Sequence, residues 1–203
     1  MQIIFYKSDL RYPRHDALSL IFKYKHLERL YFIAIIPPEK IREEITQLKV
    51  LMAERFNSKQ ALKSPPHITL HMPFKWKDKK LDQLQAAMQK LNDGFDPLDV
   101  ELNGFNFFDP RVVYVDVAAN AALEEAQKRV VDVCRKDLKL DNGNYKNRPF
   151  RPHMTIGFRD LRKEMFFEAK KYFQKRSFEA AFQAEAITLL KHDGSKWRAV
   201  SPT

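Results

Sequence analysis

The chain has 203 residues, of which 44% are hydrophobic and 12% aromatic, and this size and composition predict one globular domain with a substantial core. Its formal net charge of +10 favours a polyanionic partner, although solubility alone would also explain the charge. No apolar run reaches the roughly 18 residues that a membrane span needs, and the single cysteine, Cys134, excludes an internal disulfide, which favours a reduced, cytoplasmic setting.

The first third of the chain predicts an extension followed by a strand, a helix and a second strand. Residues 1–28 show no clear periodicity, so we interpret them as an N-terminal extension of uncertain structure. The run RLYFIAII at 29–36 has the β-branched and aromatic content of a buried strand. A helix is predicted over residues 39–56, where apolar residues recur at helical spacing. Residues 67–72 are expected to form a short strand after a proline-containing loop.

The rest of the chain mixes helices with strands. Asp78 is expected to cap a helix that ends near residue 91, and Asp109-Pro110 is expected to form a turn between two strands. The closing segment is expected to form antiparallel strands around a turn at Asp193-Gly194. The further elements predicted in chain order are strands at 98–108 and 111–118, a helix at 120–138, a loop at 141–152, a strand at 153–158 and a helix at 163–175.

Together these elements predict an α+β fold. Because strands and helices are intermixed and several connections between strands are short, the sheets should be antiparallel rather than parallel and doubly wound. A helix, a loop and a strand carrying Pro-His-x-Thr occur in this order twice, which predicts two related halves that face each other. No stretch marks a linker between independent domains, so residues 29–203 are expected to form a single bilobal domain.

The tetrapeptides PHIT and PHMT carry the strongest functional signal. Because alternate side chains of a strand share a face, His67 lies beside Thr69, and His153 lies beside Thr155. Each strand therefore offers an imidazole and a hydroxyl on one face and apolar side chains on the other. A single His-x-Thr is more often structural than catalytic, but two matched copies in matching strand contexts are hard to explain by chance.

Two imidazoles and two hydroxyls suit displacement at phosphorus. The reaction needs a base for the attacking oxygen and an acid for the leaving oxygen, and the ordinary histidine pKa of about 6.5 lets one ring be neutral while the other is charged. Threonine hydroxyls can donate hydrogen bonds to the non-bridging phosphate oxygens. This scheme requires no metal ion.

The sequence lacks the motifs of several other enzyme classes. Its five glycines are too scattered for a phosphate-binding loop or a dinucleotide fingerprint, which disfavours kinases, ATPases and oxidoreductases. It has no G-x-S-x-G nucleophile motif. His67 and His71 have the spacing of ligands on one strand face, but no acidic cluster accompanies them to complete a zinc site. We therefore expect no metal and no cofactor.

The segments HITLHMPF and HMTIGF resemble the two signatures of the two-histidine (2H) phosphoesterase superfamily, and in particular its 2'-5' RNA ligase-like (LigT-like) family. RLYFIAIIPPEKIREEI resembles the opening strand and helix of that family, and FFDPRVVYVDV resembles its middle strand. The closing AITLLKHDGSKWRAV also stands in the expected order. The resemblance covers about residues 29–200 and leaves the first 28 residues without a counterpart.

The resemblance implies a fold and an activity. The fold would be bilobal and pseudo-symmetric, with two antiparallel sheets and outer helices around a central cleft that holds both motifs. The activity would be that of a metal-independent phosphodiesterase that opens 2',3'-cyclic or 1'',2''-cyclic phosphates, or processes RNA ends. His67 would be the general acid and His153 the general base, while Thr69 and Thr155 would hold the phosphate.

The resemblance also leads to predictions about the partners of the protein. We expect RNA ends or a cyclic nucleotide as substrate, no membrane partner and a monomeric protein. The alternative is a non-catalytic RNA- or nucleotide-binding module that retains the cleft. Intact histidines and threonines in both motifs favour the enzyme.

Three further residues are candidates for contacts with the substrate. Phe74 follows the first motif and would stack on a base or sugar, unless it belongs to the core. Several relatives carry an arginine five positions after the second motif histidine, where this chain has Phe158. Arg159 and Arg151 are the candidates for the missing contact, with a solvated surface charge as the alternative for Arg151. His71 shares the predicted face of the first motif and is expected at the rim.

Overall fold

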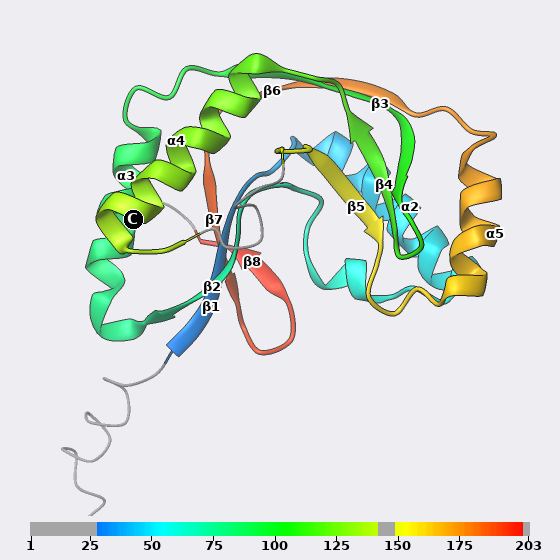
Figure 1. The fold of residues 1–203 in the computed structure, drawn as a ribbon, viewed down its shortest axis with the longest axis horizontal. Helices are drawn as coiled ribbons and strands as arrows, with labels where there is room; N and C mark the ends of the chain where they lie inside the picture. Colours follow the sequence, from blue (N-terminus) through cyan, green and yellow to red (C-terminus); the bar gives the residue numbers. More distant parts are fainter. Residues whose placement is uncertain (1–27, 142–148, 201–203) are drawn as a thin grey trace, which may run out of the picture.

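The computed structural model describes residues 28–141 and 149–200, in which the chain forms eight strands and four α-helices (Figure 1). Apart from Glu28, the predicted N-terminal extension lies outside the described residues, as do residues 142–148 of the predicted loop. The mixture of helices with antiparallel sheets confirms the predicted α+β class. None of the helices in the described ranges has the length and apolar content to cross a lipid bilayer.

The strands form two four-stranded antiparallel sheets. The first sheet has the order β2-β1-β7-β8, with β1 at Glu28–Ile35, β2 at Ile68–Lys77, β7 at Thr188–His192 and β8 at Trp197–Ala199. The second has the order β5-β4-β3-β6, with β3 at Leu98–Phe108, β4 at Val112–Val117, β5 at His153–Gly157 and β6 at Glu179–Ala184.

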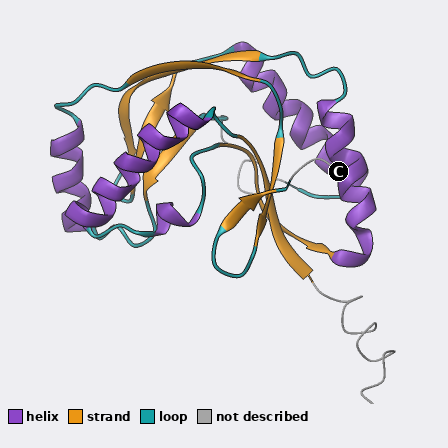
Figure 2. Cartoon of the chain, turned by 180° about the vertical axis from the view of Figure 1, so that it is seen from behind, coloured by secondary structure: helices purple, strands orange, loops and turns teal. Residues whose placement is uncertain are grey.

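The helices lie in pairs outside the sheets. They are α2 at Glu39–Phe56, α3 at Leu81–Asn92, α4 at Ala121–Leu138 and α5 at Lys163–Phe173, and two 3-10 turns occur at Gln60–Lys63 (η1) and Asp78–Lys80 (η2). Helices α3 and α4 flank one side of the molecule and α2 and α5 the other, and the view from behind shows the same arrangement (Figures 1 and 2).

The predicted repeat is present as two units with the same order of elements. In the first unit, β1, α2 and η1 lead to β2, which follows the first motif histidine; in the second, β4 and α4 lead to β5, which begins at the second. Both β2 and β5 are edge strands of their sheets. Each helix packs on the other unit's motif strand, because α2 contacts β5 and α4 contacts β2. This exchange places the two motif strands beside each other.

Gly157 on β5 leaves room for the end of the Met52 side chain, which extends from α2. A Cβ atom at Gly157 would lie 2.4 Å from Cε of Met52 on α2, closer than real Cβ atoms approach other heavy atoms. Across the molecule, Nε2 of Gln127 on α4 donates a 3.5 Å hydrogen bond to the carbonyl oxygen of Leu70 on β2. One continuous core cluster joins both sheets, and it includes Ile33 from the first and Val115 from the second.

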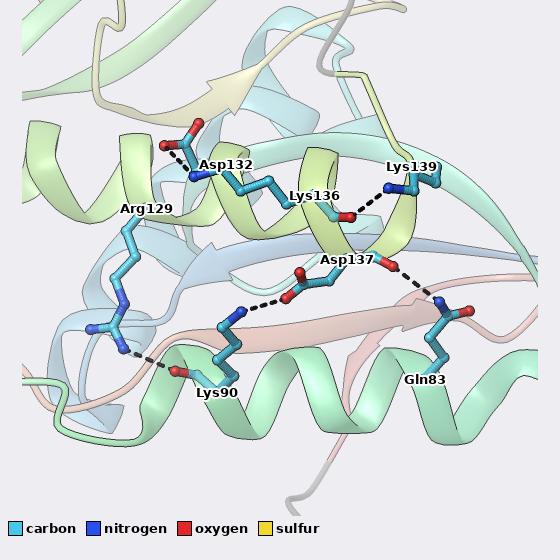
Figure 3. A network of polar contacts seen from close by, with 7 residues as sticks. All are labelled: Gln83, Lys90, Arg129, Asp132, Lys136, Asp137 and Lys139. Atoms are coloured by element: carbon cyan, nitrogen blue, oxygen red, sulfur yellow. Dashed lines mark hydrogen bonds and ion pairs between the residues drawn. The ribbon is translucent and has the colours of Figure 1, made fainter.

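A polar network joins α3 to α4 on the surface (Figure 3). Nζ of Lys90 lies 2.8 Å from Oδ2 of Asp137, and the Arg129 guanidinium donates to the carbonyl oxygens of Lys90 and Asp93 at 2.9 and 3.0 Å. Gln83 also donates to the carbonyl oxygen of Asp137 at 3.0 Å. Exposed ion pairs of this kind contribute only about 0–1 kcal/mol each, so the apolar core holds the helices in place.

The structure corrects the predicted cap at Asp78. This residue begins η2, and its carboxylate forms a 3.2 Å ion pair with Arg29 on β1 instead of capping α3, which starts at Leu81. The cap predicted at the start of the third helix is present, because Oδ1 of Asn120 accepts from the backbone N–H of Leu123 at 3.1 Å. Strand β2 also runs to Lys77, five residues beyond the predicted end.

An irregularity in β2 changes which face His71 occupies. The pairing of β2 with β1 shifts register on either side of the pair Ile33–His71. The predicted alternation therefore fails, and His71 turns into the core, where only 2% of its surface is exposed. Its Nδ1 donates to the carbonyl oxygen of Met72 at 2.9 Å, and its buried Nε2 has no hydrogen-bond partner among the described residues. The rim position predicted for His71 is wrong.

The loops that follow α2 and β5 are tied together by one carboxylate. Asp160 accepts hydrogen bonds from the backbone N–H groups of Lys59 at 2.8 Å and Gln60 at 3.1 Å, and from the Ser58 hydroxyl at 3.0 Å. Ser58 is fully buried. Because Asp160 belongs to the second unit and its donors to the first, this cluster fixes the two loops relative to each other.

We predict that Asp160→Ala lowers the free energy of unfolding by about 2 kcal/mol, because it leaves a buried hydroxyl and two amides without their charged acceptor. Urea unfolding followed by circular dichroism measures the change. The matched control is Asp96→Ala, which removes an exposed carboxylate that has no hydrogen bond to any described residue and should change the stability by less than about 0.5 kcal/mol. Equal midpoints for the two variants would contradict the bridging role.

Candidate active site

A cleft of about 440 Å³ lies where the two motif strands meet. His67 and Thr69 line it from the first unit, and His153 and Thr155 line it from the second. The four residues singled out by the paired motifs therefore face one cavity. The other walls come from the loop around η1, from the β3–β4 turn region and from the β7–β8 hairpin, through residues that include Gln60, Lys63, Phe108, Val112, His192 and Trp197.

Both motif histidines are held by the same backbone contact. Nδ1 of His67 lies 2.7 Å from the carbonyl oxygen of Pro65, and Nδ1 of His153 lies 2.7 Å from that of Arg151. A carbonyl oxygen only accepts hydrogen bonds, so Nδ1 must carry a proton in each ring. In the neutral form Nε2 is then the free acceptor, and in the charged form it is a donor. Each histidine can thus exchange a proton through Nε2 alone.

Aromatic rings fix the orientation of the two imidazoles. The ring of Phe32 packs on His67 with centroids 4.7 Å apart, and the rings of Phe108 and Tyr114 pack on His153 at 5.0 Å each. Rings at these distances gain contact energy in tilted or edge-on arrangements. They also replace water on one side of each histidine, which makes the charged form harder to maintain.

The environment lowers the pKa of His67 strongly. Burial is the largest cause, the positive charge of Lys49 adds to it, and a charge on His153 contributes as well; together they bring the pKa of His67 to about 4 against the opposing effect of the Pro65 carbonyl. His67 is therefore neutral at neutral pH in the free protein. A neutral ring with Nδ1 protonated is a proton acceptor at Nε2.

The surroundings of His153 are electrostatically different. Burial lowers its pKa, but the carbonyl oxygen of Arg151 and the carboxylate of Asp116 both raise it. Asp116 is the cross-strand partner of His153 on β4, and its carboxylate accepts hydrogen bonds from the Asn106 amide at 3.0 Å and from the Val117 backbone N–H at 3.1 Å. Of the two rings, His153 is the one with a carboxylate beside it and His67 the one with an ammonium.

Two further cations line the cleft, and no acidic residue of the described chain does. One is Lys63 at the end of η1, and the other is Arg159, which follows β5. Arg159 has a positive φ of 58°, and its guanidinium lies 5.2 Å from the centroid of the Phe158 ring. The strand ends at Gly157 instead of continuing, so this backbone turn brings Arg159 to the cleft.

The other predicted contact residues do not line the cleft. Phe74 belongs to the core, where it packs against Tyr31 and Trp76 and only 8% of its surface is exposed. The register shifts that turn His71 inward precede it on the same strand. Arg151 is exposed and contributes its backbone carbonyl to His153, while its side chain is not among the groups that line the cavity.

Sequence reasoning missed Lys49 and Asp116. Lys49 occupies a buried position on α2, in the row that Ile41, Ile45 and Met52 also form. A lysine at the spacing of an apolar helix face was the available signal, since lysine is rarely buried without a reason. Asp116 gives no such signal, because only the pairing of β4 with β5 brings it to His153.

No group of three or more histidine, cysteine or acidic side chains placed to hold a metal ion is found within residues 28–141 and 149–200. Cys134 lies in the core of α4, and burial raises its pKa to about 12. A thiol held so firmly protonated is a poor nucleophile.

Comparison with known proteins identifies a common family. The family profile of the 2'-5' RNA ligase superfamily matches residues 37–196. A protein of Geobacillus sp. (strain WCH70), provisionally named a phosphoesterase, is 31% identical over 133 residues, which is 64% of this chain and 69% of that protein. A protein of Staphylococcus haemolyticus (strain JCSC1435) with the same provisional name is 25% identical over 172 residues, or 83% of this chain and 94% of its own.

Solved structures show the same fold. LigT of E. coli, in its complex with 3'-AMP, superposes with a TM-score of 0.61 at 17% identity, covering 86% of this chain and 97% of LigT. The same protein has also been solved with NADP+ and with ATP, at TM-scores of 0.57 and 0.56. The predicted bilobal arrangement, with outer helices around two antiparallel sheets, is confirmed by this match and by the topology.

We predict that the neutral rings of His67 and His153 carry their proton on Nδ1. His192 is a control within the same cleft, because its Nδ1 accepts a hydrogen bond from the backbone N–H of Gly194 at 3.1 Å and its proton must therefore be on Nε2. Long-range ¹H–¹⁵N correlation spectra of the histidine rings above pH 7 distinguish the two tautomers. Finding the Nε2–H form for both motif histidines would contradict the carbonyl contacts.

Proposed function

Because the chain belongs to the 2'-5' RNA ligase superfamily, we propose that it is a metal-independent phosphodiesterase that opens cyclic phosphates, of the 2',3'-cyclic or 1'',2''-cyclic kind, or processes RNA ends. The observation that carries the proposal is the convergence of both motif histidines, each with a free Nε2, on one cleft without acidic side chains in its described lining. An anionic phosphate is favoured there by Lys63 and Arg159.

Each motif residue has a role in this proposal. Nε2 of the basic histidine takes a proton from water while the water oxygen forms a bond to phosphorus. The bond from phosphorus to the leaving ribose oxygen breaks, and Nε2 of the acidic histidine gives its proton to that oxygen. Thr69 and Thr155 donate hydrogen bonds to the non-bridging oxygens, whose charge grows in the transition state. The product is a phosphate monoester.

The local charges favour His67 as the base and His153 as the acid, the reverse of the order that the family resemblance implies. The charge of Lys49 favours a neutral His67, and the carboxylate of Asp116 favours a charged His153. A base must be neutral and an acid charged before the reaction begins. The assignment applies to hydrolysis, and ligation would use the same two groups in the opposite sense.

The comparison with LigT supports a nucleotide substrate. LigT binds 3'-AMP in its crystal structure, and a nucleoside 3'-monophosphate is one of the two products that opening a 2',3'-cyclic phosphate can give. We therefore expect this chain to act on a cyclic phosphate attached to ribose.

We predict hydrolysis of 2',3'-cyclic AMP in excess EDTA, and a loss of about 10²–10⁴-fold in kcat for His67→Ala or His153→Ala, since each removes one proton-transfer group. Phosphorus NMR of the product identifies which oxygen leaves. The control is His192→Ala, which removes a third histidine of the cleft and should cost less than about tenfold. Binding without turnover would support the non-catalytic module instead, and full activity in both motif variants would refute the catalytic pair.

We also predict that kcat/KM has a maximum on the acidic side of neutrality, because the pKa of each histidine is lowered in the free protein. With His67 as the base, activity falls as the pH drops through its pKa. Lys49→Met removes a positive charge, raises that pKa and moves the acidic limb to higher pH. Asp116→Asn lowers the pKa of His153 and moves the alkaline limb to lower pH.

The pH profiles of the two variants also test which of the two rings has the lower pKa. Lys63, Arg159 and His192 are the other titratable or charged side chains of the cleft and are unchanged in both. If Lys49→Met moved the alkaline limb and Asp116→Asn the acidic limb, His67 would have the higher pKa of the two rings, contrary to the effect of the local charges. A shift in neither profile would show that these charges do not act on the pair.

A further inference from the structure

A second cavity of about 530 Å³ adjoins the catalytic cleft. Lys63, Ser64 and Trp197 line both cavities, so the two are neighbours that share part of their walls. Its remaining walls come from α2, from the loop between η1 and β2, and from the residues of β8. We call it the basic cavity, after the five cations that line it: Arg42, Lys49, Lys63, Lys196 and Arg198.

The positive charge of the basic cavity is only partly compensated. No acidic side chain lines it within the described residues. Arg198 pairs with Asp193 at 2.6 Å, and Arg42 lies 4.0 Å from Glu39, both at the surface. Lys63 and Lys196 form no ion pair with any described residue. Several uncompensated cations around one hollow attract anions and raise their local concentration.

Lys49 gives the cavity a buried cation. Only 1% of its surface is exposed, and its Nζ donates one hydrogen bond, to the carbonyl oxygen of Ser64 at 3.0 Å. An ammonium group has three N–H donors, and the other two have no partner in the described part of the chain. No carboxylate pairs with it there either. Burial of such a group is costly without a counter-ion, and it lowers the pKa of Lys49 to about 7.

We propose that the basic cavity binds a second phosphate of the substrate, so that the preferred substrate is an oligonucleotide ending in a cyclic phosphate rather than a free cyclic mononucleotide. This inference rests on the proposed function, because it places the reacting phosphate in the catalytic cleft. The neighbouring internucleotide phosphate would receive hydrogen bonds from Lys49 and face the charges of Arg42 and Lys196. The nucleoside between the two phosphates would lie beside Trp197, which lines both cavities and whose ring can stack on a base.

The cavity volume agrees with this occupant. Pockets that hold small ligands measure about 300–1,000 Å³, so both cavities can accept more than a lone phosphate group. Buried cations that lack partners are satisfied best by phosphate oxygens, which form short, charge-assisted hydrogen bonds.

The contribution of the second phosphate's charge to kcat/KM can be measured with two matched dinucleotides. Both end in a 2',3'-cyclic phosphate, and they differ in the internal linkage, which is a phosphodiester in one and a neutral methylphosphonate in the other. We expect kcat/KM to be at least about tenfold higher for the charged dinucleotide. In Arg42→Gln/Lys196→Gln this preference should disappear, while hydrolysis of 2',3'-cyclic AMP stays at the level of the unmodified protein.

The control is Lys128→Gln/Lys171→Gln, which removes two exposed lysines that line neither cavity and should retain the preference. Equal kcat/KM values for the two dinucleotides in the unmodified protein would overturn the inference. A preference that survives in Arg42→Gln/Lys196→Gln would overturn it as well.

A binding measurement separates this inference from the proposed function, since it needs no turnover. Inorganic pyrophosphate is added at pH 6, where Lys49 is charged, and the increase in Tm is recorded. The measurement is made in the Thr69→Ala/Thr155→Ala background, which weakens anion binding in the catalytic cleft. We expect an increase that is lost when Arg42→Gln and Lys196→Gln are added. No increase, or one that the added substitutions leave intact, would refute the second site even if cyclic phosphates are hydrolysed.

Discussion

The exchange of helices between the two units is the constraint on which the site depends. Each motif strand lies at the edge of its sheet, and it is covered by the helix of the opposite unit. Gly157 leaves room for the end of the Met52 side chain at β5, and Asp160 joins the adjoining loops by hydrogen bonds. The two units therefore cannot separate without exposing apolar surface on both helices, so the distance between the motif histidines is fixed by the packing of the core rather than by flexible loops.

The two units place their histidines in similar positions, but the charged residues around the two rings differ. The backbone contacts both histidines in the same way, because one carbonyl oxygen lies 2.7 Å from each Nδ1. The difference comes from two charged residues, because Lys49 lowers the pKa of His67 and Asp116 raises that of His153. Two rings of the same chemical type can thereby differ in proton affinity, as general acid–base catalysis requires.

Much of the fold could be predicted from the sequence, because its signals are local. The bounds of α2 and the turn at Asp109-Pro110 follow from apolar spacing and turn chemistry, and the structure has both. The paired Pro-His-x-Thr segments also predicted which side chains share the cleft. The predictions that failed concern contacts between residues that are far apart in the sequence. The inward turn of His71 follows from its pairing with β1, and the proximity of Asp116 to His153 follows from strand register, neither of which is recorded in the neighbouring residues.

The edge position of β2 and β5 has one more consequence. An edge strand keeps a row of backbone N–H and C=O groups that no neighbouring strand uses, and here both such rows belong to strands that meet at the cleft. Main-chain amides are donors that no side-chain substitution removes. Replacing the four motif side chains would therefore leave these main-chain groups of β2 and β5 in place.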